Sequence, residues 1–172
     1  MSDKPIANIY ELPSKHAKKG SRFEAHATRV GGAIGAERLG MQYVVVPPGK
    51  TGFPRHNHRN NEELFVILEG EGTYRKGDNS WLVRAGDAIA APAGDATTAH
   101  QLTNTGGEDL KYLAISTRSD PDIVEYPDSD KFMVAASIPP GGGMMGADFK
   151  IVGRDRPLLD YWDGEDIGDD EL

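Results

Sequence analysis

Short runs of apolar and β-branched residues, separated by turns rich in glycine and proline, recur along most of the 172-residue chain. Their spacing of about 8 to 12 residues is typical of a sandwich or barrel of short strands. Helix signals are almost absent. Ten short strands are predicted, and this number requires either a closed barrel or two packed sheets. The predicted strands are residues 23–28, 38–46, 63–68, 72–75, 81–83, 88–91, 100–103, 110–116, 123–126 and 132–137.

The chain is long enough to bury a sizeable core in one domain, but it is too short for a second full domain. We expect an N-terminal extension (1–22), a barrel core (23–118), and C-terminal strands with an acidic tail (119–172). Residues 138–143 read Ile-Pro-Pro-Gly-Gly-Gly. Because runs of glycine and proline resist packing, we predict a mobile loop there.

The composition is that of a water-soluble globular protein, with 38% apolar and 27% charged residues. The longest apolar stretches, such as residues 41–48, are far shorter than the roughly 20 residues of a membrane-spanning helix, so we predict no membrane span. The N-terminus lacks the apolar run and the cleavage site of a secretory signal. We therefore expect the protein to reside in the cytoplasm.

Charge and cysteine content exclude several kinds of partner and of functional site. The formal net charge is −8, which argues against a nucleic-acid partner. We interpret the acidic tail as a solvated, partly frayed terminus. The chain has no cysteine, so disulfides, thiolate metal sites and cysteine nucleophiles are excluded, and any metal must bind nitrogen and oxygen ligands. The acids of the tail are Asp160, Asp163, Glu165, Asp166, Asp169, Asp170 and Glu171.

Two of the five histidines, His56 and His58, stand one residue apart. Because side chains alternate along an extended backbone, both imidazoles project to the same face and can share one ion. Glu63 follows at the start of the apolar run 64–68, where a carboxylate could complete the site. An H-x-H pair alone is a weak signal. The spacing around this pair makes the signal more specific.

That spacing resembles two motifs of the cupin superfamily over residues 47–104. The first is matched by Pro47-Pro48-Gly49, His56-x-His58, four residues, Glu63, six residues and Gly70. The second is matched by Gly86, five residues, Pro92-Ala93-Gly94, His100, three residues and Asn104. Six residues separate Gly49 from His56 and five separate Gly94 from His100, both more than the family usually has. The longer second loop precedes His100 directly, so it affects both the position of His100 and the route by which a substrate could enter.

The resemblance implies an all-β fold, the double-stranded β-helix or jelly roll of a cupin barrel, with one divalent metal ion inside it. It implies four ligands: His56, His58, Glu63 and His100. Glu62 is the competing carboxylate, and the six-residue gap to Gly70 favours Glu63. Three imidazoles and one carboxylate suit Fe, Mn, Ni, Co, Cu or Zn, so the metal is not specified. His16 and His26 fit no motif, and we interpret them as ordinary surface or core residues.

An ion with open coordination positions would be catalytic, whereas a structural ion is usually enclosed. We therefore predict a metal-dependent enzyme, an isomerase, lyase or oxygenase, acting on a small polar molecule. Two alternatives stay open: a non-catalytic cupin that binds or senses a small molecule, and an ion that only steadies the barrel. Residues 126–129 and 160–165 resemble an uncharacterised branch of bacterial cupins, some of them named sugar-phosphate isomerases.

Catalytic residues cannot be named from the sequence, but proton donors or anchors near the motif strands are Tyr43, Tyr74, Thr98, Gln101 and Glu62. The nearby cations are Lys50, Arg55 and Arg59. If the two histidines point inward, strand alternation turns both arginines outward, where we expect them to be solvated. This expectation argues against phosphate specificity.

We also predict a homodimer. An open barrel leaves strand edges and an apolar outer face that a second copy can cover. Residues 23–28 or 132–137 could supply the docked or exchanged strands.

Overall fold

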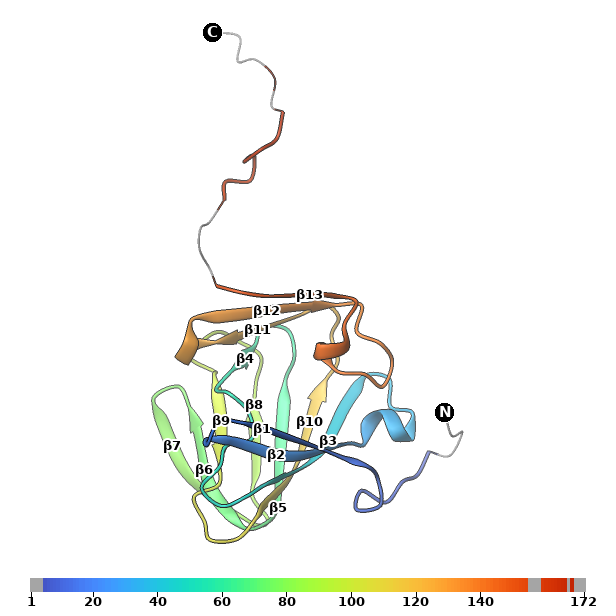
Figure 1. Cartoon of the computed structure of the whole chain (residues 1–172), viewed down its shortest axis with the longest axis vertical. Helices are drawn as coiled ribbons and strands as arrows, with labels where there is room; N and C mark the ends of the chain where they lie inside the picture. Colours follow the sequence, from blue (N-terminus) through green and yellow to red (C-terminus); the bar gives the residue numbers. More distant parts are fainter. Residues whose placement is uncertain (1–4, 155–158, 167, 169–172) are drawn as a thin grey trace.

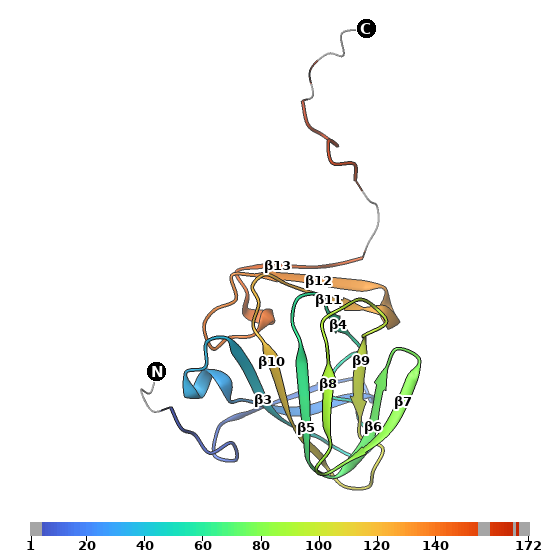
Figure 2. The same cartoon turned by 180° about the vertical axis from the view of Figure 1, so that it is seen from behind.

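The computed structural model describes residues 5–154, 159–166 and 168, and β-strands dominate this part of the chain. Six strands form the larger wall of a barrel, all paired antiparallel in the order β1-β2-β3-β10-β5-β8. Figure 2 shows β3, β10, β5 and β8 side by side in this wall. The six strands are β1 (Ser14–Lys19), β2 (Phe23–Arg29), β3 (Leu39–Val46), β10 (Leu110–Thr117), β5 (Glu63–Glu69) and β8 (Ala88–Ala91).

Two smaller sheets complete the barrel. One has the order β7-β6-β9 and the other β13-β12-β11-β4. Single bridges between Thr51 and Thr103 and between His56 and His100 join the segment before β4 to β9, so the two sheets are continuous with one another. The strands are β7 (Asn79–Arg84), β6 (Glu71–Lys76), β9 (His100–Thr103), β13 (Phe149–Gly153), β12 (Lys131–Ala136), β11 (Asp122–Tyr126) and β4 (Asn57–His58).

The β11–β12–β13 layer lies across one end of the barrel (Figure 1). Three short 3₁₀ helices also occur, η1 (Gly31–Ile34), η2 (Pro127–Ser129) and η3 (Met144–Gly146). The loop between β12 and η3 packs on η1 so closely that a Cβ on Gly32 would lie 2.6 Å from the Gly141 Cα. The loop 138–143 is therefore placed against η1, and its mobility stays a prediction. No helix in the described residues is long and apolar enough to cross a bilayer.

The barrel core follows from strand alternation. On β5 the side chains of Phe65 and Ile67 are buried, while Leu64 between β10 and β8 is exposed. The facing strands also contribute every second residue to the core, because alternate residues point to one face of a sheet. The central cluster contains Ala25, Val44, Val46, Phe65, Ile67, Tyr74, Val83, Ala91, Leu102, Leu110 and Tyr112.

Substitution of Ile67 by Ala should lower the free energy of unfolding by about 2 to 5 kcal/mol, because Ile67 is 1% exposed and its loss leaves a cavity. The matched control is Leu64→Ala on the opposite face of the same strand, where the residue is 39% exposed and the expected loss is below about 1 kcal/mol. Urea denaturation of both variants measures this difference. Equal destabilisation by the two substitutions would contradict the assigned register of β5.

All ten predicted strands are present, and the all-β prediction is confirmed. Residues 88–91 and 100–103 form strands with the predicted bounds, and each of the other eight strands differs from its prediction by one or two residues at one or both ends. Strands β1, β4 and β13 were not predicted. β1 has the sequence SKHAKK and is exposed throughout, so no alternation of apolar residues marks it. β4 has only two residues, too few for any periodic signal.

The structure bears on two further expectations. The strands named as candidates for dimerisation, at 23–28 and 132–137, are paired on both sides within the chain, as β2 and β12. Their outer neighbours β1 and β13 hold the sheet edges, and the homodimer stays a prediction. Tail residues 159–166 are exposed, whereas 155–158, 167 and 169–172 lie outside the described residues.

Candidate metal centre

Backbone pairing brings the two histidine motifs together. His56 N donates to the carbonyl of His100 at 3.1 Å, and His100 N donates to the carbonyl of His56 at 2.8 Å. These two bonds place the start of β4 beside the start of β9. Asn57 points to the other side, where its amide donates to Gly94 O at 2.9 Å and to Glu125 Oε2 at 2.7 Å. The buried Asn57 therefore anchors the short strand and fixes the direction of its flanking histidines.

The four predicted ligands converge on one carboxylate oxygen. Glu63 Oε2 lies 2.9 Å from His100 Nε2, 3.5 Å from His58 Nε2 and 3.6 Å from His56 Nε2. One ligand atom of each of His56, His58 and Glu63 lies within 4.8 Å of the others, a cluster compact enough for one metal ion. Glu62, the competing carboxylate, is exposed. The strand start therefore turns Glu63 into the cluster and Glu62 to solvent.

Each imidazole is held from behind through its Nδ1 atom. The Nδ1 atoms of His56 and His100 lie 2.8 Å from Pro54 O and 3.3 Å from Thr98 O, and Nδ1 of His58 lies 2.7 Å from Asp122 Oδ2. Carbonyl and carboxylate oxygens only accept, so each Nδ1 donates its proton. In their neutral form the three rings then direct Nε2 lone pairs toward Glu63, and a ring that is also protonated at Nε2 donates from that atom to the Glu63 carboxylate.

Four electron-pair donors that face one another repel unless a proton or a cation lies among them. A divalent ion satisfies all four, because neutral imidazole nitrogen and carboxylate oxygen are ordinary ligands of first-row metals. A hydrogen bond from the second ring nitrogen to a carboxylate or carbonyl is also the usual support of a metal-bound histidine. The donor set and its supporting contacts therefore fit a metal ion.

The electrostatics of the cluster agree with this fit. Burial raises the pKa of Glu63, but hydrogen bonds with His100 and His56 and the nearby imidazoles outweigh burial, so the pKa lies well below its usual value. Burial lowers the pKa of His100, and its contact with Glu63 opposes this only in part. Burial also lowers the pKa of His58, but the Asp122 hydrogen bond and the Glu63 and Asp122 charges raise it overall. An ionised Glu63 and a neutral His100 are the forms that bind metal.

Asp122 is a site residue that the sequence did not reveal. It is 2% exposed, begins β11, and contacts His58 from 64 positions along the chain. Its other carboxylate oxygen has no hydrogen-bond partner within the described residues. A usable signal existed, since Asp122 sits two residues before Val124, a position buried on the same strand face. An aspartate at an inward strand position is rarely buried without a partner.

The expectation that Arg55 is solvated is wrong. The residue points away from the histidines, as alternation required, but the loop before His100 and η2 cover it, and it is 8% exposed. Its guanidinium donates to Asp128 Oδ1 at 3.1 Å and to the carbonyls of Gly77 and Ala96. Arg59 is half exposed and pairs with Glu125 at 2.7 Å. Lys50 Nζ donates to Ser21 O.

The other candidate side chains take different positions. Tyr43 alternates with Gln42 on β3 and stacks edge-on with Tyr10 on the outer side of the barrel. Gln101 alternates with His100, and its amide donates to Phe53 O. Thr98 supports the site through its carbonyl, while its hydroxyl donates to Asp95 O. Within the described residues, none of these three side chains forms a hydrogen bond or a ring contact with the four clustered residues.

Tyr74 is the candidate that remains beside the cluster. Its ring stacks on His100 with the centroids 6.1 Å apart, and the residue is 4% exposed. Burial, with the charge of Glu63 added, raises the pKa of Tyr74 to about 12. The hydroxyl has no hydrogen-bond partner within the described residues. Tyr74 is therefore a protonated, buried donor inside the barrel.

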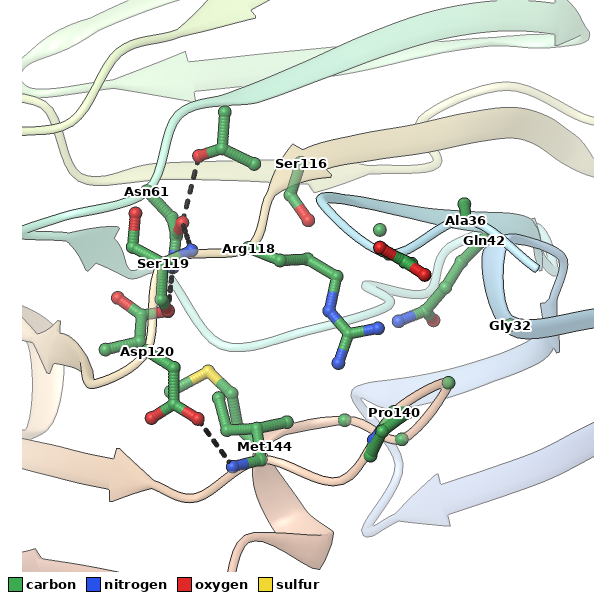
Figure 3. A pocket seen from close by; sticks show the side chains of 18 of the residues that line it. Gly32, Ala36, Gln42, Asn61, Ser116, Arg118, Ser119, Asp120, Pro140 and Met144 are labelled. Atoms are coloured by element: carbon green, nitrogen blue, oxygen red, sulfur yellow. Dashed lines mark hydrogen bonds between the residues drawn. The ribbon is translucent and has the colours of Figure 1, made fainter.

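A cleft of about 680 Å³ leads from the surface to this cluster. His58, Glu63 and Asp122 line its inner part, and Gln42, Asn61 and Arg118 line its sides. Figure 3 shows the Arg118 side chain extending across the cleft, between Gln42 and the loop at Pro140. A cleft of this size accommodates a small molecule. Its outer rim is built by η1 and residues 138–144.

Residues 42–116 match the family model described as the Cupin domain. Over these residues the chain is similar to the cupin family. A solved structure from Silicibacter pomeroyi, described as a sugar phosphate isomerase from a cupin superfamily, superimposes with a TM-score of 0.73 at 22% identity. The alignment covers 91% of this chain and 98% of that one, and at this identity it shows the fold alone. The double-stranded β-helix predicted for this chain is confirmed.

Two curated relatives are similar to part of the chain. The oxalate-binding protein of Thermotoga maritima is 33% identical over 70 residues, which are 41% of this chain and 54% of that protein. Auxin-binding protein 1 of Arabidopsis thaliana is 31% identical over 133 residues, which are 72% of this chain and 64% of that protein. The chain thus spans less than two thirds of the length of either relative.

Proposed function

We propose that this chain binds one divalent metal ion through His56, His58, Glu63 and His100, and that it is a metal-dependent enzyme acting on a small polar substrate. The observation that carries the proposal is the convergence of three Nε2 atoms on Glu63 Oε2, with every Nδ1 engaged behind them. The cleft supports an enzyme over a purely structural ion, because it reaches His58 and Glu63 from solvent.

A bound ion would act as a Lewis acid that stabilises negative charge developing on a substrate oxygen. The protein itself orients the imidazole rings that would bind the ion. Asp122 fixes the ring of His58, and the main chain fixes the rings of His56 and His100. The Tyr74 hydroxyl, protonated at neutral pH, is available as a hydrogen-bond donor within the barrel. The apolar wall of Phe65 and Tyr112 behind it limits water.

Three reaction classes fit these features: an isomerase acting on a sugar phosphate, a lyase and an oxygenase. The likeness to the Silicibacter pomeroyi protein and the oxalate-binding relative supports a small, oxygen-rich, anionic molecule. The alternative is a cupin that binds such a molecule without converting it, which the name of the oxalate-binding relative supports. Dioxygen dependence separates the oxygenase from the isomerase and the lyase, and turnover itself separates all three enzymes from a binder.

The test begins with protein purified without chelator or nickel resin. Elemental analysis should find about one equivalent of a first-row divalent metal per chain. The metal-loaded protein is then incubated with sugar phosphates and with small hydroxy and keto acids, each with and without dioxygen, and products are followed by NMR. Product formed without dioxygen supports the isomerase where the product has the composition of the substrate, and the lyase where the substrate is split into two products. Product formed only with dioxygen supports the oxygenase.

Binding of a probe without product would favour the non-catalytic cupin. Wild-type protein that contains no metal and takes up none on titration would contradict the proposal, because the four donors would then lack the ion that their arrangement fits.

A further inference from the structure

We infer that the ligand of this cleft has two polar ends. One end lies at the metal centre, and the other is a carboxylate or phosphate group that the Arg118 guanidinium binds. Only the statement that one end of the ligand lies at the metal centre rests on the proposed function. The statement that Arg118 binds the other end rests on the geometry of the cleft.

Arg118 is placed by the strand that faces the metal centre. It follows the end of β10, where Ser116 is paired across the ladder with Glu63. Gly40 on β3 leaves the space that these side chains occupy, since a Cβ there would lie 2.5 Å from Ser116 Oγ and 3.8 Å from Arg118 Cγ. The pairing of β10 with β5 therefore fixes where Arg118 lies relative to Glu63.

Arg118 is the only Lys or Arg among the described residues that line the cleft. Its one hydrogen bond within the described residues goes from Nη2 to the Pro139 carbonyl at 3.2 Å. A guanidinium carries several N–H donors in a planar fork that suits a carboxylate or a phosphate. Most of the donors of Arg118 are therefore left for a ligand in the cleft (Figure 3).

Two of the acids that line the cleft with Arg118 are engaged elsewhere. Asp120 accepts from the backbone amides of Ser137 and Ile138 at 2.9 and 2.8 Å, and Asp122 accepts from His58. Glu37 also lines the cleft, is exposed, and forms no ion pair within the described residues. The three cations considered from the sequence, Lys50, Arg55 and Arg59, bond to Ser21, Asp128 and Glu125 outside the cleft. Within the described lining of the cleft, Arg118 is therefore the cation placed to bind an anionic ligand, while Arg29, the cross-strand neighbour of Gln42, has its guanidinium against Gly143 and does not itself line the cleft.

Isothermal titration with matched probes tests this inference. One arm compares dicarboxylates from malonate to adipate with monocarboxylates of equal length, and the other compares fructose 6-phosphate with fructose. We expect wild-type protein to bind the more anionic member of at least one arm about tenfold to a hundredfold more tightly, the range for hydrogen bonds to charged groups. The arm with the larger difference identifies the group as carboxylate or phosphate.

Arg118→Gln should remove this preference, and Arg118→Lys should retain part of it, while elemental analysis shows unchanged metal content. Arg38→Gln is the matched control, because Arg38 is exposed just before β3 and does not line the cleft. Glu37→Gln should keep or strengthen the preference, because it removes a carboxylate that could compete for the guanidinium. A preference that appears only in Glu37→Gln and is absent from the wild type would assign Arg118 to a pair with Glu37 and overturn the inference.

The titrations are run on metal-loaded and metal-free protein. A preference that depends on Arg118 in both forms supports the inference even where the metal proposal fails. No preference in the wild-type protein in either form, or an undiminished preference in Arg118→Gln, overturns the inference whatever the metal content.

Discussion

Replacement of His100 or His58 by Ala should empty the metal centre, with metal content falling from about one equivalent per chain to below about a tenth of one. Each substitution removes one of four donors, and a vacated inward position cannot be filled by a neighbour, because the other rings are held through Nδ1. Elemental analysis after dialysis, with a competitive chelator titration, measures the loss.

The matched control is His26→Ala. His26 is exposed on β2 and stacks on His16 with ring centroids 4.5 Å apart, away from the cleft. Its loss should leave the metal content unchanged. Circular dichroism of each variant shows whether the barrel still forms, and a folded His100→Ala protein that retains a full equivalent of metal would contradict the four-ligand site.

Asp122→Asn should weaken metal binding by about tenfold to a hundredfold, the range for removing the partner of a metal-binding histidine. The aspartate lies 2.7 Å from Nδ1 of His58 and, by hydrogen bond and charge, raises the pKa of that ring. A neutral amide of the same shape keeps the cavity filled but removes the charge that makes Nε2 a stronger ligand. Competitive titration against a chelator of known affinity measures the change.

The control for this substitution is Asp130→Asn at the exposed turn before β12. Asp130 has a left-handed backbone with φ of 50°, which asparagine also tolerates, so the fold should be unaffected. Equal metal affinity of the Asp122→Asn protein and the wild type would show that Asp122 only fills space beside His58.

Prediction from the sequence succeeded where the governing interactions are local. Side-chain alternation places His56 and His58 on one face of their segment, and alternation along β5 separates Phe65 and Ile67 from Leu64. The cross-strand partner of His56 could be named only through the resemblance, since nothing local links it to His100. The exposed strand β1 left no periodic signal, because its stability comes from pairing with β2 rather than from burial.

Arg55 shows where local reasoning fails. Alternation gave the direction of the side chain correctly, but solvation depends on what covers that face. Here Asp128 arrives from 73 positions further along the chain and gives the guanidinium a partner in place of water. The same reasoning from the motif drew attention to Lys50 and Arg59, which are near in sequence and bonded elsewhere.

The sequence by itself determined the all-β class, the strands with apolar alternation, and the donor chemistry of the candidate centre, because these follow from a period of two and from residue type. Only the tertiary structure decided that Asp122 supports His58, that Arg55 is buried, and that Arg118 faces the cleft. Each of these depends on strand register and on the β11–β12–β13 layer lying across the barrel end, which are set by contacts between residues far apart in the chain.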